Sequence, residues 1–319
     1  MRTLPRIAVI FAAFWLAGEA ASGASPASGR SRPTAGPRPP RVVASIMPVH
    51  SLAAGVMEGV GVPILLVRGA ATPHTFALRP LGALALRRAE VVFWVGAQLE
   101  IFLVKPLAAL ARNARVVHLS RAEGLTLYPA RASGGTVPGG GVSPTGADMH
   151  IWLSPANARA MARAMARAMG AVDPANAGKY RENRMRLDAR LAGLDREIKS
   201  RLGPVRTVPY IVLHDAFQYF EKHYGLRGAG AIAAAPGRRP GARRLFAIRK
   251  RIRETGARCV FGEPQFQADL VSVAAGGTHA RTAILDPLGA ALPPDAAAYF
   301  TLMRALADSF RGCLLSPGK

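Results

Sequence analysis

The chain has 319 residues, 50% of them hydrophobic, and its 42 Lys and Arg against 19 Asp and Glu give a formal net charge of +23. A charge of this size is usual in proteins that bind nucleic acid or another acidic surface. Here the positive charge is mostly arginine, spread through the predicted helices and the N-terminal segment rather than gathered with aromatic residues into one stripe. We therefore exclude nucleic acid as a partner.

The first residues predict export. Arg2 and Arg6 precede an apolar run over residues 7–16, and mostly small residues follow as far as Ala24. This is the order of a secretory signal peptide, which we assign to residues 1–24. The run is shorter than the roughly 18 apolar residues of a membrane helix, and no later stretch reaches that length. No cysteine lies near the expected cleavage region, so we expect a mature protein that is soluble, exported and not lipidated.

The chain after the signal peptide predicts a leader and two lobes. Residues 25–40 are rich in Pro, Ser, Gly and Arg without an apolar period, which predicts a disordered leader. The remaining stretch is near the size at which one hydrophobic core divides into two. Only Cys259 and Cys313 are present, and in an oxidising compartment such a pair predicts a disulfide, with two separate buried thiols as the alternative.

Apolar runs alternate with helical patterns along the first half. This alternation is typical of a parallel α/β sheet with right-handed crossovers. A loop dominated by Gly, Ser, Thr and Pro follows over residues 129–148, long enough to be functional or disordered. The predicted strands are residues 41–48, closed by Pro48, 62–67, 90–96 and 116–119, and the predicted helices are residues 49–57 and 79–88.

Two helices and a second α/β pattern come next. Ser154 is a predicted N-cap with Pro155 in the first turn of a helix that runs to Met169. A long helix over residues 173–202 shows one apolar stripe, as expected of a strut between lobes. The stripe comprises Leu187, Leu191, Leu194, Ile198 and Leu202. The second half then predicts strands at residues 208–213, 259–262 and 283–287, and helices at residues 214–223 and 243–255.

Three histidines stand at the ends of apolar or turn-forming stretches: His74, His150 and His214. Neutral imidazole is a common ligand of zinc, and three imidazoles with a carboxylate or a water make a tetrahedral site. Ligands so far apart in sequence meet only if the fold assembles them, which predicts a cleft between lobes. His214 and Asp286 follow predicted strands, where open α/β sheets bind their ligands.

Six short motifs in this order resemble the metal-specific solute-binding proteins of ABC importers, and among them the zinc-uptake members. The resemblance implies an α/β fold of two Rossmann-like lobes, residues 41–172 and 203–319, joined by the rigid helix 173–202, with one metal between them. It also implies a monomeric periplasmic carrier, not an enzyme, that captures Zn²⁺ and delivers it to an inner-membrane ABC permease. The motifs are Pro73-His74 with Leu78-Arg79-Pro80, Val95-Gly96 with Leu99-Glu100, Met149 to Pro155, His214 to Phe217 with Tyr219-Phe220, Gly262 to Phe266, and Leu285 to Gly289.

The resemblance also implies the ligands. His74 and His150 come from the N-terminal lobe and His214 from the C-terminal lobe, while Asp286 matches a carboxylate that completes the site in some relatives and is replaced by water or another acid in others. A third imidazole favours zinc, whereas relatives carrying manganese or iron tend to have a glutamate at the position of His214. A manganese- or iron-binding member is therefore the alternative. Glu263 is either a partner that orients an imidazole or a surface acid.

The chain departs from the family pattern at two places, and it also has a rival functional interpretation. Residues 129–147 contain no histidine or acid, unlike the metal-gathering loop of many relatives, and Pro73 stands where some relatives have a glutamate. The rival is a secreted zinc hydrolase with Asp215 or Glu263 as base. No His-Glu-x-x-His motif supports it.

Overall fold

The computed structural model describes residues 38–131, 146–233, 240–267 and 269–316. The predicted signal peptide and nearly all of the predicted leader lie outside these residues, as do residues 132–145 of the predicted loop. From Pro39 onward the chain forms one compact unit. Among the described residues, no helix combines the length and the apolar character that crossing a membrane requires.

Two parallel four-stranded sheets follow one another in the chain and share one topology. The first has the strand order β2-β1-β3-β4 and the second β6-β5-β7-β8, so in both the second strand lies beside the first and the third on its other side. This confirms the predicted α/β class. The strands are β1 Val42–Ala44, β2 Ile64–Leu65, β3 Val91–Trp94, β4 Arg115–His118, β5 Tyr210–Val212, β6 Gly228–Ala231, β7 Cys259–Gly262 and β8 Arg281–Ile284.

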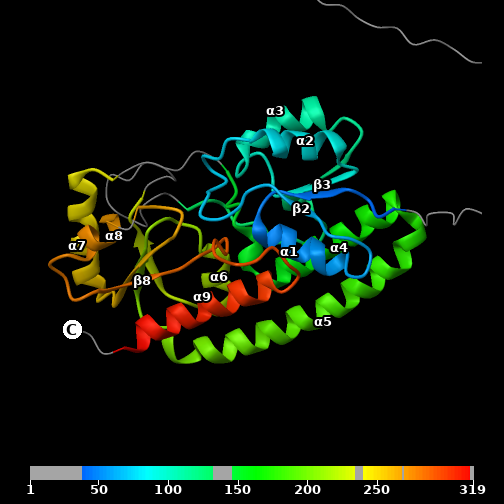
Figure 1. Cartoon of the computed structure of the whole chain (residues 1–319). Helices are drawn as coiled ribbons and strands as arrows, with labels where there is room; N and C mark the ends of the chain where they lie inside the picture. Colours follow the sequence, from blue (N-terminus) through cyan, green and yellow to red (C-terminus); the bar gives the residue numbers. More distant parts are fainter. Residues whose placement is uncertain (1–37, 132–145, 234–239, 268, 317–319) are drawn as a thin grey trace, which may run out of the picture. The chain divides into compact units, whose positions relative to one another are not determined.

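Helices of both halves cover the sheets. Figure 1 shows α2 and α3 together over the first sheet and α7 and α8 together beside the second. The α-helices are α1 Met47–Val56, α2 Pro80–Arg88, α3 Ile101–Leu110, α4 Pro155–Val172, α5 Ala177–Leu202, α6 Gln218–Tyr224, α7 Ala242–Thr255, α8 Asp269–Ala275 and α9 Ala298–Leu315.

The side chains of each strand alternate between two apolar layers, because successive residues of a strand point to opposite faces of the sheet. In β3, Val91 and Phe93 belong to a core that extends through both halves of the molecule, whereas Val92 and Trp94 pack in a separate cluster with residues of α2 and α3. In the second sheet, Ile211 similarly faces a cluster formed with α7 and α8. The inner faces of the two sheets therefore share one continuous core.

The long helix α5 supports this shared core. Its 26 residues span roughly 40 Å, and the five apolar residues of its predicted stripe are all buried. α5 and α9 run side by side (Figure 1), and ion pairs join Arg304 to Glu197 and Arg201 to Asp308 across them. Ser154 accepts a hydrogen bond from the amide of Asn157 at the start of α4, which confirms its predicted capping role.

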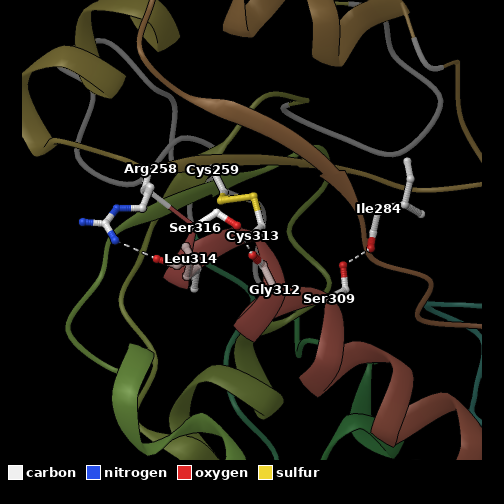
Figure 2. Close-up of a disulfide and its surroundings, with 8 residues drawn as sticks. All are labelled: Arg258, Cys259, Ile284, Ser309, Gly312, Cys313, Leu314 and Ser316. Atoms are coloured by element: carbon white, nitrogen blue, oxygen red, sulfur yellow. Dashed lines mark hydrogen bonds between the residues drawn. A yellow bond between two sulfur atoms is a disulfide. The ribbon is translucent and has the colours of Figure 1, made fainter. Parts of the chain in front are cut away.

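A disulfide attaches the end of α9 to the second sheet. Cys313, in the last turns of α9, is bonded to Cys259, the first residue of β7 (Figure 2), as the sequence predicted. Beside it, Arg258 donates a hydrogen bond to the carbonyl oxygen of Leu314 at 2.8 Å. The covalent bond and the hydrogen bond together hold the C-terminal end of α9 against β7.

Several boundaries differ from the predictions. Helix α6 begins at Gln218 rather than at His214, because the amide of His214 donates to the Glu263 carboxylate and the amide of Ala216 turns back to the carbonyl of His214. Strand β8 covers Arg281–Ile284 and ends before Asp286. The sequence did not predict α3, β6, α8 or α9.

Candidate metal centre

The structure brings His74, His150 and His214 together. Their ring centroids lie 5.5 Å (His74 to His150), 5.4 Å (His74 to His214) and 4.9 Å (His150 to His214) apart. One nitrogen from each ring lies within 4.8 Å of the other two. Ligand nitrogens around a tetrahedral zinc ion, bonded at about 2.0–2.1 Å, are about 3.4 Å apart, so a small contraction of this cluster suits the ion.

His214 is held by a carboxylate from the neighbouring strand. It follows β5, and Glu263 follows β7, the strand paired with β5. The Nδ1 atom of His214 lies 3.0 Å from Oε2 and 3.2 Å from Oε1 of Glu263. Because Nδ1–H donates to this carboxylate, Nε2 is left as the free nitrogen, and it is buried without a hydrogen-bond partner. A metal ion at the centre of the three rings would satisfy that buried nitrogen.

His150 is oriented in the same way by an aspartate two residues before it. Its Nδ1 lies 2.8 Å from Oδ1 of Asp148, and its backbone amide donates to the same oxygen. Burial would raise the pKa of Asp148, but the contacts with His150 outweigh burial and hold the pKa below its usual range. Asp148 is therefore placed to fix the tautomer of His150, and a carboxylate in this role strengthens metal binding where the imidazole is a ligand. Asp148 was not among the predicted site residues, although it stands only two residues before His150 in the sequence.

The segment after His150 is anchored to the second half of the chain. A short 3₁₀ helix, Ile151–Leu153, carries Trp152, whose indole Nε1–H donates to the carbonyl of Pro287 at 2.7 Å. The carbonyl of Trp152 in turn accepts a hydrogen bond from the hydroxyl of Tyr299 at the start of α9. These contacts place His150 between the two halves of the protein.

His74 approaches from the loop that follows β2 and is only partly buried. Burial, reinforced by repulsion from His150 and His214, lowers the pKa of His74 to about 2. For His214, burial also disfavours the charged ring, but the Glu263 carboxylate outweighs it and raises the pKa of His214 above its usual 6.5. Burial and crowding thus favour the neutral form of the His74 ring, whereas Glu263 favours the charged form of the His214 ring, and a metal ion would have to compete with that proton.

Asp286 lies two residues beyond the end of β8, and its carboxylate is occupied by a turn. Oδ1 accepts hydrogen bonds from the amides of Leu288 and Gly289 at 3.0 and 2.9 Å and from the side chain of Gln265 at 2.8 Å, and Oδ2 accepts one from the amide of Ala290 at 2.6 Å. Among the described residues, the cluster of ligand atoms contains the three histidines without Asp286. Its role as a fourth ligand stays a prediction.

The histidines line a small cavity that is otherwise largely apolar. Trp152, Phe266, Pro287 and Leu288 contribute to its walls. A larger cleft of about 350 Å³ shares Thr72, His214, Gln265 and Phe266 with it and leads away from the rings. The small cavity that the histidines line is therefore largely apolar and adjoins the larger cleft.

Comparisons with known proteins agree with this geometry. The family model described as "Zinc-uptake complex component A periplasmic", ZnuA, matches residues 42–313. The high-affinity zinc uptake system protein ZnuA of Brucella abortus (strain 2308) is 39% identical over 304 residues, covering 86% of this chain and 91% of that protein. A crystal structure of ZnuA has a TM-score of 0.75 at 26% identity, covering 86% of this chain and 99% of that one. The 138–173 deletion mutant of ZnuA with zinc bound has a TM-score of 0.74 at 26% identity, covering 88% and 99%.

Proposed function

This chain belongs to the ZnuA family of periplasmic zinc-uptake components, and we propose that it captures Zn²⁺ through His74, His150 and His214 and delivers it to an inner-membrane ABC permease. The observation that carries the proposal is the meeting of three imidazoles, two of which have Nδ1 fixed by a buried carboxylate. Zn²⁺ is the cargo of this site rather than a resident cofactor.

The donor set supports zinc over harder cations. Three imidazole nitrogens suit zinc, whereas manganese and iron relatives need more oxygen donors. The carboxylates of Glu263 and Asp148 are both engaged with the Nδ1 atoms of histidines. This engagement favours their use as orienting groups and leaves the imidazoles as the ligands.

The fourth ligand is Asp286 or a water molecule. Asp286 remains the prediction from the family pattern. Its three hydrogen bonds within the turn and a fourth from Gln265 support water as the alternative. The family consists of solute-binding transport proteins, so the proposal includes no catalytic step. We propose a monomeric, periplasmic protein released from its signal peptide, for which the Cys259–Cys313 disulfide suits an oxidising compartment.

Calorimetric titration of the mature, chelator-stripped protein with Zn²⁺ and Mn²⁺ tests the proposal. We expect one tightly bound zinc per chain and weaker manganese binding. Absence of zinc binding, or a preference for manganese, would overturn the assignment of the cargo.

A further inference from the structure

The two ends of the long loop before His150 form a short antiparallel pair. The amide of Ala130 donates to the carbonyl of Gly146 at 2.8 Å, the amide of Asp148 donates to the carbonyl of Tyr128 at 2.8 Å, and Pro129 faces Ala147 in an antiparallel bridge. We call residues 128–131 and 146–148 the loop base. Because Asp148 belongs to it, the position of the loop base sets the position of the carboxylate that orients His150.

Helix α6, from the second half of the chain, binds the loop base through polar side chains. The hydroxyl of Tyr219 accepts a hydrogen bond from the amide of Tyr128 at 3.0 Å and donates one to the carbonyl of Asp148 at 2.7 Å. The side-chain amide of Gln218 donates to the carbonyl of Pro129 and to Oδ2 of Asp148, both at 3.1 Å. One carboxylate oxygen of Asp148 therefore contacts the ring of His150, and the other accepts a hydrogen bond from Gln218 of α6.

Arg131 adds an ionic contact at the same junction. Its guanidinium makes a two-pronged contact with the carboxylate of Asp215, with Nε 2.9 Å from Oδ2 and Nη2 against Oδ1. Nη1 donates to Oε2 of Glu221 at 2.6 Å, and the other oxygen of Glu221 accepts a hydrogen bond from the hydroxyl of Tyr210. The paired geometry is the one in which arginine binds carboxylates most strongly.

The Glu221 carboxylate that Arg131 contacts lies in a closely packed, buried position. The Glu221 side chain is 5% exposed, and the carboxylate occupies space that a Cβ at Gly228 would invade. Burying a carboxylate is costly unless a charge partner and hydrogen bonds compensate for the lost water. Arg131 is the cation that both carboxylates share, so its removal would leave the buried Glu221 and the partly buried Asp215 close together without a shared cation.

We propose that Arg131 is a positioning residue of the zinc site, which fixes the distance between His150 and His214. Arg131 belongs to the loop base, as does Asp148, which orients His150. Its guanidinium donates hydrogen bonds to Asp215, the residue directly after His214. One side chain thus connects the segment that carries the support of His150 to the residue next to His214, and the two histidines come from different halves of the protein. This inference rests on the proposed function and adds to it the residue that sets the spacing of the ligands.

Replacing Arg131 tests the inference. Arg131→Met removes both the positive charge and the guanidinium donors while keeping a side chain of similar length. Arg131→Lys keeps the charge but cannot contact a carboxylate through two nitrogens. We would measure the rate of zinc release to a fluorescent chelator and the visible absorption spectrum of the Co²⁺-loaded protein, which reports ligand geometry. We expect Arg131→Met to release zinc about tenfold faster or more, with an altered Co²⁺ spectrum, and Arg131→Lys to lie between it and the wild type. The matched control is Arg167→Met, which removes an exposed ion pair between Arg167 on α4 and Glu123, and it should behave as wild type.

A triple variant, Arg131→Met with Asp215→Asn and Glu221→Gln, separates positioning from charge repulsion and protects against a folding failure of the single variant. It removes the two carboxylates that Arg131 would otherwise leave unpaired, and fast zinc release should persist in it. Wild-type release and spectrum in Arg131→Met, whatever its thermal stability, or recovery of wild-type release in the triple variant, would overturn the inference. Failure of the wild-type protein to bind zinc would instead overturn the proposed function.

Discussion

The carboxylate of Glu263 lies within hydrogen-bond distance of Nδ1 of His214 through both of its oxygens, at 3.0 and 3.2 Å, and the side chain of Glu263 is 1% exposed. His214 comes shortly after the end of β5, and Glu263 comes directly after the end of β7. These two strands are adjacent and parallel. The pairing of these strands therefore determines which nitrogen of His214 faces the other two histidines. A carboxylate in this position also makes the imidazole a more basic ligand.

Removing the Glu263 carboxylate should weaken zinc binding. In Glu263→Ala we expect the zinc dissociation constant to rise by about 10–100-fold, the usual cost of losing a group that orients a metal-bound histidine. Calorimetric titration measures it. Glu254→Ala, at an exposed glutamate of α7 paired with Lys250, is the control and should leave the affinity unchanged. Equal affinities for the two variants would show that Glu263 does not act on the site.

Zinc affinity should fall as the pH falls. Glu263 raises the pKa of His214 above 6.5, so the metal-free protein keeps a proton on His214 until the pH exceeds that raised value. Above it the ligand is free of its proton and affinity is highest; below it affinity drops by about tenfold per pH unit for each proton displaced. His74, with a pKa of about 2, does not contribute in this range. Titrations between about pH 7.5 and 5.5 test this, and a constant affinity across that range would contradict it.

The imidazole at position 214 should determine selectivity. In His214→Glu we expect the ratio of zinc affinity to manganese affinity to fall, because an oxygen ligand suits the harder cation. Loss of a group that only orients a ligand already costs ~10-fold in metal affinity, so we expect the ratio to fall by at least that factor. Competition between Zn²⁺ and Mn²⁺ at one site measures the ratio. His279→Glu, at an exposed histidine, gives the comparison. An unchanged ratio in His214→Glu would remove the argument that the third imidazole selects zinc.

The disulfide should support stability without supporting zinc binding. Cys259 begins β7, whereas Glu263 follows the opposite end of that strand, so the bond and the metal site are separated by the length of the strand. In Cys259→Ser with Cys313→Ser we expect a loss of about 2–5 kcal/mol in the free energy of unfolding. Denaturant unfolding of the metal-free protein measures it, with zinc affinity expected within a few-fold of wild type. A large loss of affinity at intact fold would show that α9 acts on the site.

The sequence predicted the parallel sheets well because their strands are continuous apolar runs. It missed β6, Gly228–Ala231, since a Gly-Ala alternation lacks the branched and aromatic residues by which strands are recognised. It also missed α3, which contains Pro106 and is apolar on nearly every face, so no helical period stands out. The limit in both cases is that tertiary packing, rather than local preference, stabilises the element.

The three clustered histidines were predictable because each lies in a motif, but the residues that orient them were mostly not. Glu263 was interpreted either as a partner that orients an imidazole or as a surface acid, and the structure shows its contact with His214. Gln218 and Arg131 act through partners that are distant in the sequence, and no spacing rule identifies such partners. Asp148 lies only two residues before His150, but its contact with the ring depends on how the fold turns the segment. Asp286 was predicted from its position after a strand, where the structure shows a carboxylate that also closes a turn.

The most direct test of the account is a crystal structure of the zinc-loaded protein with diffraction data collected at the zinc absorption edge. We predict one anomalous peak among His74, His150 and His214, bonded to one nitrogen of each at about 2.0–2.1 Å, with the fourth position showing either Asp286 or water. A peak that lacks any of these three histidines as a ligand, or a protein that takes up no zinc, would contradict the central claim that these imidazoles form the zinc site.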